Sequence, residues 1–298
     1  FDPRLHTEKQ LNFLFKIKNI VLRPINENLI DMIWSRKPKG LAKPFYLIPS
    51  KQTGKNSLKK IQQVQKILLK NKLDYLLVTA SENVAWLLNI RGQDTSHSPI
   101  PNSRLLISKK GTIDFFVNPK KLSKLKKIKI RVHDEKNMER ILSSLSKEKI
   151  LLDSISCSFF FKQLLVRKNK VIERIDPIHF FKSIKNNTEI KNMKICHLKD
   201  GIALTKFLLW LKKNFKSKKI TEISAERKLE SFRKMNRSYK FPSFNTISGS
   251  GPNSAIIHYR ASYKTNRKLK KGELYLVDSG GQYSFGTTDV TRTISLEN

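Results

Sequence analysis

Two aspartates near the C-terminal end of the sequence have the spacing expected of a paired-carboxylate site. The apolar run 274–277 ends on Asp278, and the segment 287–294 alternates between polar and apolar residues and contains Asp289. Glycines 280, 281 and 286 lie between these two stretches. A short apolar run and a period of two, with Thr and Val enriched, are typical of strands, so we predict an antiparallel hairpin.

The register of this hairpin decides its chemistry. A turn centred between Tyr283 and Ser284 would place Asp278 directly opposite Asp289, with Cβ atoms about 4.5–5.5 Å apart. Two carboxylates at that distance repel each other, and one takes up a proton unless a cation lies between them. Two-metal hydrolytic sites, with ions about 3.5–4 Å apart, need carboxylates at this spacing. The alternative is a polar hairpin with both side chains in solvent, and the spacing alone leaves both open.

The sequences around both aspartates resemble the first two metal-ligand motifs of the aminopeptidase P family, the Xaa-Pro aminopeptidases. These motifs read Leu-Val-Asp278-Ser-Gly and Gly-Thr-Thr-Asp289-Val-Thr-Arg-Thr. Members of the family are pita-bread metallopeptidases. The resemblance implies that Asp278 binds one ion of a two-metal site, that Asp289 bridges both ions, and that the ions are divalent and usually manganese.

The N-terminal part of the chain resembles the large, three-domain form of the same family. Asp2-Pro-Arg-Leu-His-Thr and Asn28-Leu-Ile-Asp-Met-Ile-Trp34 are similar to the end of its first domain, so we expect residues 1–49 to be a remnant of that domain plus a linker. The stretches 85–94 and 97–101 resemble its middle domain. His97 itself, beside Pro99, is typical of a polar loop residue.

Residues 50–176 alternate between predicted helices and strands, with Lys109-Lys-Gly111 as a hairpin turn. Such alternation is typical of α/β domains. With the resemblance, it predicts an α/β middle domain with a mixed, ribonuclease-H-like sheet. Strands are predicted at residues 75–79, 104–107, 112–117, 128–132, 150–152 and 171–175.

Asp176-Pro177 breaks the pattern, and we expect residues 177–298 to be the N-terminal part of an α+β pita-bread catalytic domain, truncated. A helix is predicted to begin at Thr188, with a weak point at Asp200-Gly201 because glycine disfavours helix interiors. A second helix is predicted from Thr221 to about Lys234.

A histidine is the third candidate site residue. Asn253-Ser-Ala-Ile-Ile-His258 resembles the family motif Asn-x-Ala-Ile-x-His, whose histidine borders the substrate. We expect the segment 255–259 to be a short strand and His258 to bind substrate. A neutral imidazole can hydrogen-bond to a scissile amide or to a tetrahedral intermediate. Without the resemblance, a lone histidine on a strand is more often structural.

The resemblance implies release of the N-terminal residue from peptides with proline second, by a hydroxide on the two metal ions that attacks the carbonyl before proline. Prolidase is a near neighbour, and the first-domain remnant argues against it. The family needs one further His and two Glu ligands on later strands, and this sequence reaches Asn298 before them. We therefore expect a fragment that is inactive and binds metal poorly alone. A homodimer is compatible with the resemblance.

Composition limits the other function classes. The formal net charge is +36, from 45 Lys and 15 Arg against 24 acidic residues, and it would attract any polyanion. Base readout favours Arg, Asn and Gln, and no nucleic-acid motif is present, so no specific nucleic-acid binding is expected.

No apolar run could span a membrane. Cys157 and Cys196, far apart, fit a cytoplasmic protein. The alternatives are a non-catalytic pita-bread module that binds a peptide or partner and, less favoured, a basic nucleic-acid-binding protein.

Overall fold

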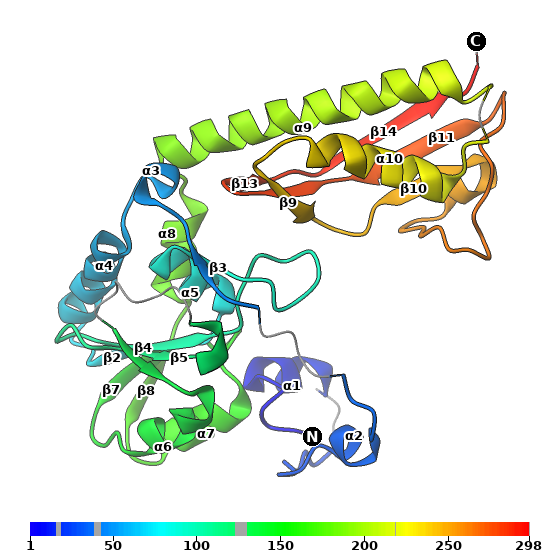
Figure 1. Cartoon of the computed structure of the whole chain (residues 1–298). Coiled ribbons are helices and arrows are strands. Elements are labelled where there is room, and N and C mark those ends of the chain that lie inside the picture. The colour runs from blue at the N-terminus through cyan, green and yellow to red at the C-terminus, as the bar shows by residue number, and fades with distance from the viewer. Residues whose placement is uncertain (16–18, 39–42, 123–129, 218, 298) are drawn as a thin grey trace. The chain divides into compact units, whose positions relative to one another are not determined.

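The chain forms two compact units with separate hydrophobic cores (Figure 1). The computed structural model describes residues 1–15, 19–38, 43–122, 130–217 and 219–297. Unit 1 contains residues 1–50, 55–94 and 100–185, and unit 2 contains residues 51–54, 95–99 and 186–298. The domain boundaries predicted after residues 49 and 176 stay predictions. Within the described ranges, no helix is both long and apolar enough to cross a membrane.

Unit 1 is built on a six-stranded mixed sheet in the order β6-β5-β4-β2-β7-β8. The pairs β2–β4 and β4–β5 are antiparallel, and the pairs β5–β6, β2–β7 and β7–β8 are parallel. The predicted mixed sheet is therefore confirmed, although residues 128–129 of one predicted strand lie outside the described residues. The strands are β2 (Tyr75–Val78), β4 (Arg104–Ser108), β5 (Ile113–Phe116), β6 (Arg131–His133), β7 (Lys149–Leu152) and β8 (Lys170–Glu173); β1 (Tyr46–Leu47) and β3 (Ile90–Arg91) pair separately.

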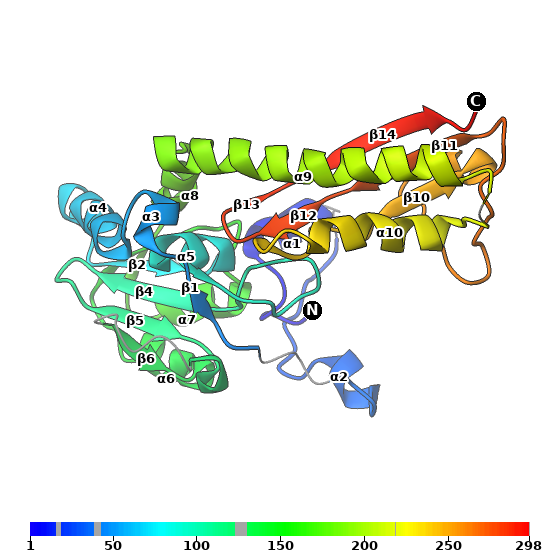
Figure 2. The ribbon, with the colours of Figure 1, turned by 45° about the horizontal axis from the view of Figure 1, so that its top comes forward.

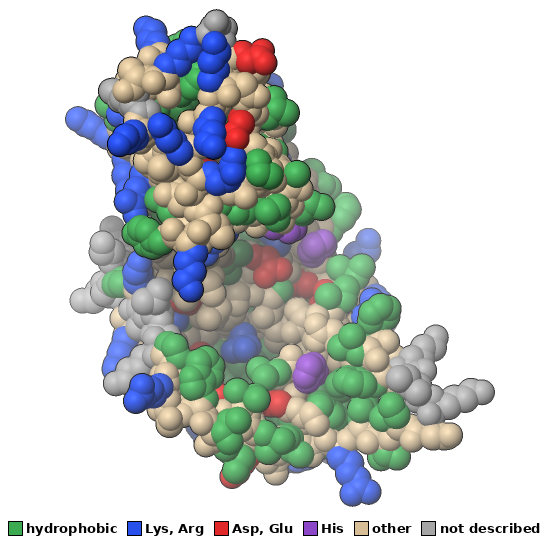
Figure 3. All heavy atoms as spheres, turned by 90° about the vertical axis from the view of Figure 1, so that its right-hand side faces the viewer, with side chains coloured by type: hydrophobic (Ala, Val, Ile, Leu, Met, Phe, Trp, Pro, Cys, Tyr) green, Lys and Arg blue, Asp and Glu red, His purple; other side chains and the backbone are tan. Residues whose placement is uncertain are grey.

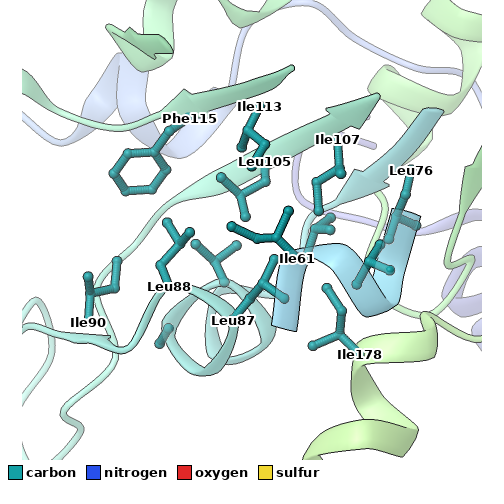
Figure 4. Close-up of a cluster of buried hydrophobic side chains, with 14 of the residues drawn as sticks. Ile61, Leu76, Leu87, Leu88, Ile90, Leu105, Ile107, Ile113, Phe115 and Ile178 are labelled. Atoms are coloured by element: carbon teal, nitrogen blue, oxygen red, sulfur yellow. The ribbon is translucent and has the colours of Figure 1, made fainter. Parts of the chain in front are cut away.

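Both faces of this sheet are apolar, because its central strands carry hydrophobic residues at consecutive positions. Leu76 packs into one core cluster with residues of α4, α5 and α8 (Figure 4). Leu77 packs into a second cluster, with residues of α6 and α7. Near-continuous apolar strands are what a sheet covered on both faces requires. The helices of unit 1 are α1 (Glu8–Leu14), α2 (Leu29–Ile33), α4 (Ser57–Lys70), α5 (Ser81–Leu88), α6 (Met138–Ser143), α7 (Phe159–Val166) and α8 (Pro177–Ser183), with the 3-10 turns η1 (Pro119–Lys121) and η2 (Glu135–Asn137).

Unit 2 places two helices, α9 (Asn187–Asn214) and α10 (Glu222–Lys234), along one face of antiparallel strands (Figure 2). The weak point predicted at Asp200-Gly201 is wrong, because α9 runs through it unbroken. Asp200 is buried and paired with Arg233 of α10, so tertiary contacts offset the low helix propensity of Gly201. The short helix α3 (Ser50–Thr53) precedes residue 54.

The strands of unit 2 form two three-stranded antiparallel sheets, ordered β10-β11-β14 and β13-β12-β9. Tyr275 and Val277 of β11 pack against α9 and α10 in the core of the unit. The intervening residues of β11 must point to the opposite face. The strands are β9 (Tyr239–Pro242), β10 (Ile247–Ser250), β11 (Leu274–Ser279), β12 (Gly281–Tyr283), β13 (Gly286–Thr287) and β14 (Val290–Ser295), and η3 (Gly251–Ala255) is a 3-10 turn.

Positive charge gathers in one part of unit 2, and the two cysteines lie in the interior of the protein. Figure 3 shows Lys and Arg side chains over the end of unit 2, where the segment 260–271 carries six cations and no acid. Cys157 and Cys196 are both buried, and burial raises the pKa of each thiol to about 12. Since the thiolate is the reactive form, neither cysteine is suited to nucleophilic or redox chemistry.

Replacing Gly201 by alanine tests the account of α9. No atom lies within 4 Å of a Cβ at this position, and its φ is not left-handed. We expect Gly201→Ala to raise the free energy of unfolding by about 0.5–1 kcal/mol, measured by urea denaturation. Gly251→Ala is the matched control: φ is +54° and the new Cβ would lie 2.9 Å from Glu273, so this variant should be less stable. A less stable Gly201→Ala protein would show that the helix is strained there.

Candidate metal and substrate site

The predicted hairpin is present, and its strand pairing is interrupted at one point between β11 and β12. β11 and β14 pair with Asp278 opposite Thr291, and β12 and β13 pair with Gln282 opposite Thr287. Both ladders have the same register, so they are one hairpin interrupted at Gly280 and residues 288–289. On the other edge, β10 pairs with β11 and β9 pairs with β12. The two sheets are therefore one long three-stranded sheet with a break across it.

Close packing of the backbone defines the break. A Cβ on residue 280 would lie 1.9 Å from the carbonyl oxygen of Thr288 and 2.2 Å from Ser243 Oγ, so only glycine fits there. Thr288 is buried, and its Oγ1 accepts a hydrogen bond from Gly281 N at 2.9 Å. Ser243 donates through N to Gly280 O at 3.1 Å and through Oγ to Thr288 O at 2.8 Å. Hydrogen bonds thus fix the chain at the break, and Gly280 lies two residues from Asp278.

The predicted register is wrong, because the centre of the turn lies one residue further along the chain than expected. Tyr283 pairs with Gly286, so the turn is centred between Ser284 and Phe285, and Asp278 lies opposite Thr291 and not opposite Asp289. The physical reason is Tyr283, which is buried and donates its hydroxyl hydrogen to Asp200 at 2.6 Å. A position in the turn would expose this ring and remove that bond.

Asp278 and Asp289 nevertheless share one face of the hairpin. Val277 and Val290 pack toward the helices, so their neighbours Asp278 and Asp289 point to the face that α9 and α10 leave uncovered. The register makes the two aspartates diagonal neighbours, and such pairs have typical separations of about 7–8 Å. At that distance the two carboxylates no longer repel each other at contact, yet both can reach a cation between them.

One carboxylate oxygen supports a cation at this position. Asp278 Oδ1 is buried and has no hydrogen-bond partner among the described residues. An unsatisfied buried acceptor of this kind costs about 1–3 kcal/mol, and more for a charged group. Carboxylate oxygens are hard ligands of the type that Mn²⁺ and Mg²⁺ prefer, so the donors present fit a divalent ion.

The candidate metal site contains few protein ligands among the described residues. Among the residues that the structure describes, no group of three or more His, Cys, Asp or Glu side chains is arranged to hold a metal ion. Asp278 and Asp289 therefore offer two carboxylates, of which Asp289 is exposed to solvent. A divalent ion there would need further ligands or water.

His258 lies in a turn, and the strand predicted for residues 255–259 is wrong. The 3-10 turn η3 ends at Ala255, and His258 follows in the left-handed conformation with φ +56°. Tyr259 N donates to Ile256 O at 3.1 Å and closes the turn. Pro252 near the start of η3 presets a helical φ, which outweighs the strand preference of the apolar residues that follow. The imidazole is exposed and accessible to a ligand.

A buried carboxylate that the sequence did not single out holds the segment carrying His258. Glu222, the first residue of α10, has no exposed surface. Its Oε1 accepts from Ser250 N at 2.8 Å and from Asn253 Nδ2 at 3.1 Å. Its Oε2 accepts from the hydroxyl of Tyr259 at 2.8 Å and from Arg267 N at 2.9 Å. One side chain therefore ties together both ends of the loop 250–267.

The only signal of Glu222 in the sequence is its place in the first turn of a helix. An acid there is usually explained by the helix dipole, and such residues are normally exposed. The four donors come from residues 28 to 45 positions further along the chain, so no local pattern reveals them.

His97 also belongs to unit 2, although it precedes the rest of that unit in sequence. It lies in a loop, as expected, with φ +65°. Its ring contacts Pro242 O at 3.0 Å through Nδ1 and Asn245 Oδ1 at 2.9 Å through Nε2. Gln282 Nε2 donates to His97 O at 3.1 Å. The loop is therefore bonded to β9, to β12 and to Asn245, which follows β9.

Two protein-family models match the chain. The creatinase/prolidase N-terminal domain matches residues 36–189, and metallopeptidase family M24 matches residues 191–298. The chain belongs to the creatinase/prolidase family of M24 metallopeptidases. This membership confirms the predicted fold classes, a mixed-sheet α/β domain followed by an α+β pita-bread domain.

Several relatives of the chain are named as Xaa-Pro aminopeptidases. A probable Xaa-Pro aminopeptidase P of Paracoccidioides brasiliensis is 33% identical over 98% of this chain and 51% of its own length. Xaa-Pro aminopeptidase ApepP of Drosophila melanogaster is 35% identical over 98% of this chain and 50% of its own length. The chain therefore spans about half the length of these relatives.

Solved structures show the same likeness. The crystal structure of X-prolyl aminopeptidase from Caenorhabditis elegans, described as a cytosolic enzyme with a di-nuclear active site, matches 100% of this chain and 51% of its own, with a TM-score of 0.90 and 30% identity. Prolidase from Pyrococcus horikoshii matches 80% of this chain and 65% of its own, with a TM-score of 0.62 and 24% identity, which shows the shared fold. The predicted aminopeptidase P resemblance is confirmed.

Glu222→Gln tests whether the Glu222 carboxylate holds the loop 250–267, which carries His258. The amide would replace one acceptor oxygen by an NH₂ group facing a donor, so we expect a loss of about 1–3 kcal/mol in the free energy of unfolding. We also expect faster amide hydrogen exchange across residues 250–267. The control is Glu226→Gln, the same change one turn later on α10, which should change both readouts little. Equal effects of the two substitutions would contradict a specific role for Glu222.

Proposed function

We propose that the protein is an Xaa-Pro aminopeptidase with a two-metal site, in which Asp278 and Asp289 are the first two ligands. The observation that carries the proposal is the buried, unpartnered Oδ1 of Asp278 on the same open face as Asp289. Support comes from relatives named as Xaa-Pro aminopeptidases and from the di-nuclear active site of the Caenorhabditis elegans enzyme. The substrates are peptides with proline at the second position.

The residues of this chain have distinct tasks in that reaction. When bound, a pair of divalent ions would supply an activated water and polarise the carbonyl group before proline. Asp278, fixed in a strand with its Oδ1 buried, and Asp289, at the edge of the break, would hold these ions. His258 donates or accepts a hydrogen bond at the substrate amide, from a turn that Glu222 holds in place. The imidazole of His258 is exposed to solvent, as a group that contacts substrate must be.

The finer points are part of the same proposal. The ions are manganese, the protein acts in the cytoplasm, it binds no specific nucleic acid or membrane, and it forms a homodimer. Two carboxylates leave most of the coordination positions of a divalent ion to water. Residues 1–298 by themselves should therefore bind metal weakly and lack peptidase activity, and three further ligands, one His and two Glu, complete the site in an active enzyme.

A second candidate is a pita-bread module that binds a peptide or partner without chemistry. The observation in its favour is that the described residues contain no third metal ligand near Asp278. The two candidates differ in whether the gene's longest product is active with Mn²⁺.

The decisive experiment follows release of arginine from Arg-Pro-Pro with Mn²⁺ by the longest product that the gene encodes. We expect activity, and a loss of about 10³-fold or more in both Asp278→Asn and Asp289→Asn, because each change removes a charged metal ligand. Glu230→Gln is the control, since Glu230 pairs with Lys234 of its own helix at 2.9 Å and is not one of the proposed metal ligands. Residues 1–298 alone should be inactive. A long product that binds such peptides without cleaving them would favour the non-catalytic module.

A further inference from the structure

A buried ion pair lies on the helix side of the sheet, behind the candidate metal site. Arg233 of α10 contacts Asp200 of α9 through two parallel bonds, Nε to Oδ1 at 2.8 Å and Nη2 to Oδ2 at 3.0 Å. Each residue is 2% exposed. The pair therefore joins the two helices in surroundings from which water is excluded.

The same pair contacts the strands on both sides of the break. Arg233 Nη2 donates to Ser279 Oγ at 3.1 Å, and Tyr283 donates its hydroxyl hydrogen to Asp200 Oδ1 at 2.6 Å. Ser279 is the last residue of β11, and Tyr283 is the last residue of β12. Gly280 lies between them, so the network holds the chain just before and just after the irregular step.

Joining the two helices does not by itself require an ion pair. Removing two charges from water costs several kcal/mol per ion, and well-packed apolar residues of similar volume are often as stabilising or better. What a guanidinium adds is direction, because a bidentate carboxylate fixes its plane and so fixes where the remaining N–H groups point. Here one such N–H points at Ser279, the residue directly after Asp278.

We propose that Arg233, held by Asp200, is a positioning residue that sets the orientation of the Asp278 carboxylate through Ser279. Ser279 and Asp278 are consecutive in a strand and point to opposite faces, so holding Ser279 on the helix side restricts the strand that presents Asp278 on the other. Tyr283 holds the next strand segment in the same way. The proposal rests on the proposed function, in which Asp278 binds a divalent ion, and it assigns to Arg233 the geometry of that ligand.

Ser279→Ala is the sharpest test, because it removes one hydroxyl group and leaves the ion pair in place. The readout is the Kd for Mn²⁺, measured by electron paramagnetic resonance of the free ion, in the longest product that the gene encodes. Since loss of a group that orients a metal ligand typically weakens affinity by 10–100-fold, we expect a Kd raised by about 10-fold. Thermal unfolding of the same samples reports stability separately.

Ser248→Ala is the matched control. Ser248 is a buried serine on the neighbouring strand β10, and its Oγ bonds to Glu222 O and to the Tyr275 hydroxyl, each at 2.8 Å. It faces the helices as Ser279 does, without contacting Arg233. We expect Ser248→Ala to lower the melting temperature at least as much as Ser279→Ala and to leave the Kd for Mn²⁺ unchanged.

A double variant separates positioning from stability. In Asp200→Leu with Arg233→Met, apolar side chains replace the ion pair, so any fall in melting temperature should come from the Ser279 and Tyr283 hydroxyl groups that lose their partners. The directed N–H is gone, and we expect the Kd for Mn²⁺ to rise by about 10-fold. Arg233→Lys, which keeps a charge without the planar fork, should also raise the Kd.

The outcomes distinguish this proposal from the function on which it rests. A raised Kd in Asp278→Asn, with an unchanged Kd in both Ser279→Ala and the double variant, overturns the positioning role and leaves the metal site standing. An unchanged Kd in Asp278→Asn overturns the metal site and the positioning role together. A raised Kd in Ser279→Ala and the double variant, with Ser248→Ala unaffected, supports both.

Discussion

The contact between Gly280 and the backbone of Thr288 is the constraint on which the candidate metal site depends. Three strand segments approach so closely there that a Cβ at position 280 would lie 1.9 Å from a carbonyl oxygen. The ladder therefore stops and restarts, and Asp278 and Asp289 lie at the edge of that stop. Beside that stop, Asp278 Oδ1 is buried and has no hydrogen-bond partner among the described residues.

Buried acids on the helix side support this arrangement without taking part in it. Glu222 satisfies donors from the loop that carries His258, and Asp200 satisfies donors from α10 and β12. Each is surrounded by hydrogen-bond donors, which is the condition for burying a carboxylate at acceptable cost. Asp278 differs from both, since its buried Oδ1 has no donor among the residues that the structure describes. That contrast separates the acids that hold the fold from the one suited to bind a cation.

Unit 1 shows how far pattern alone leads. Its strands follow from short apolar runs separated by helical stretches and by the Lys109-Lys110-Gly111 turn, whereas the family resemblance predicted their mixed arrangement. The strand predicted around His258 failed because Pro252 begins a 3-10 turn that the apolar residues Ile256 and Ile257 mask. The weak point predicted in α9 failed because Arg233, from another helix, compensates at Asp200. In both cases one local preference was outweighed by another constraint.

By itself the sequence determined the fold classes, the family and the hairpin with its two aspartates, because these depend on short motifs and on hydrophobic periodicity along the chain. Only the tertiary structure decided the register, which follows from the burial of Tyr283 against Asp200, a residue 83 positions away. It also decided the turn at His258, the clamp by Glu222 and the network of Arg233. These features are set by contacts between segments distant in sequence, and no spacing along one chain encodes which of them will meet.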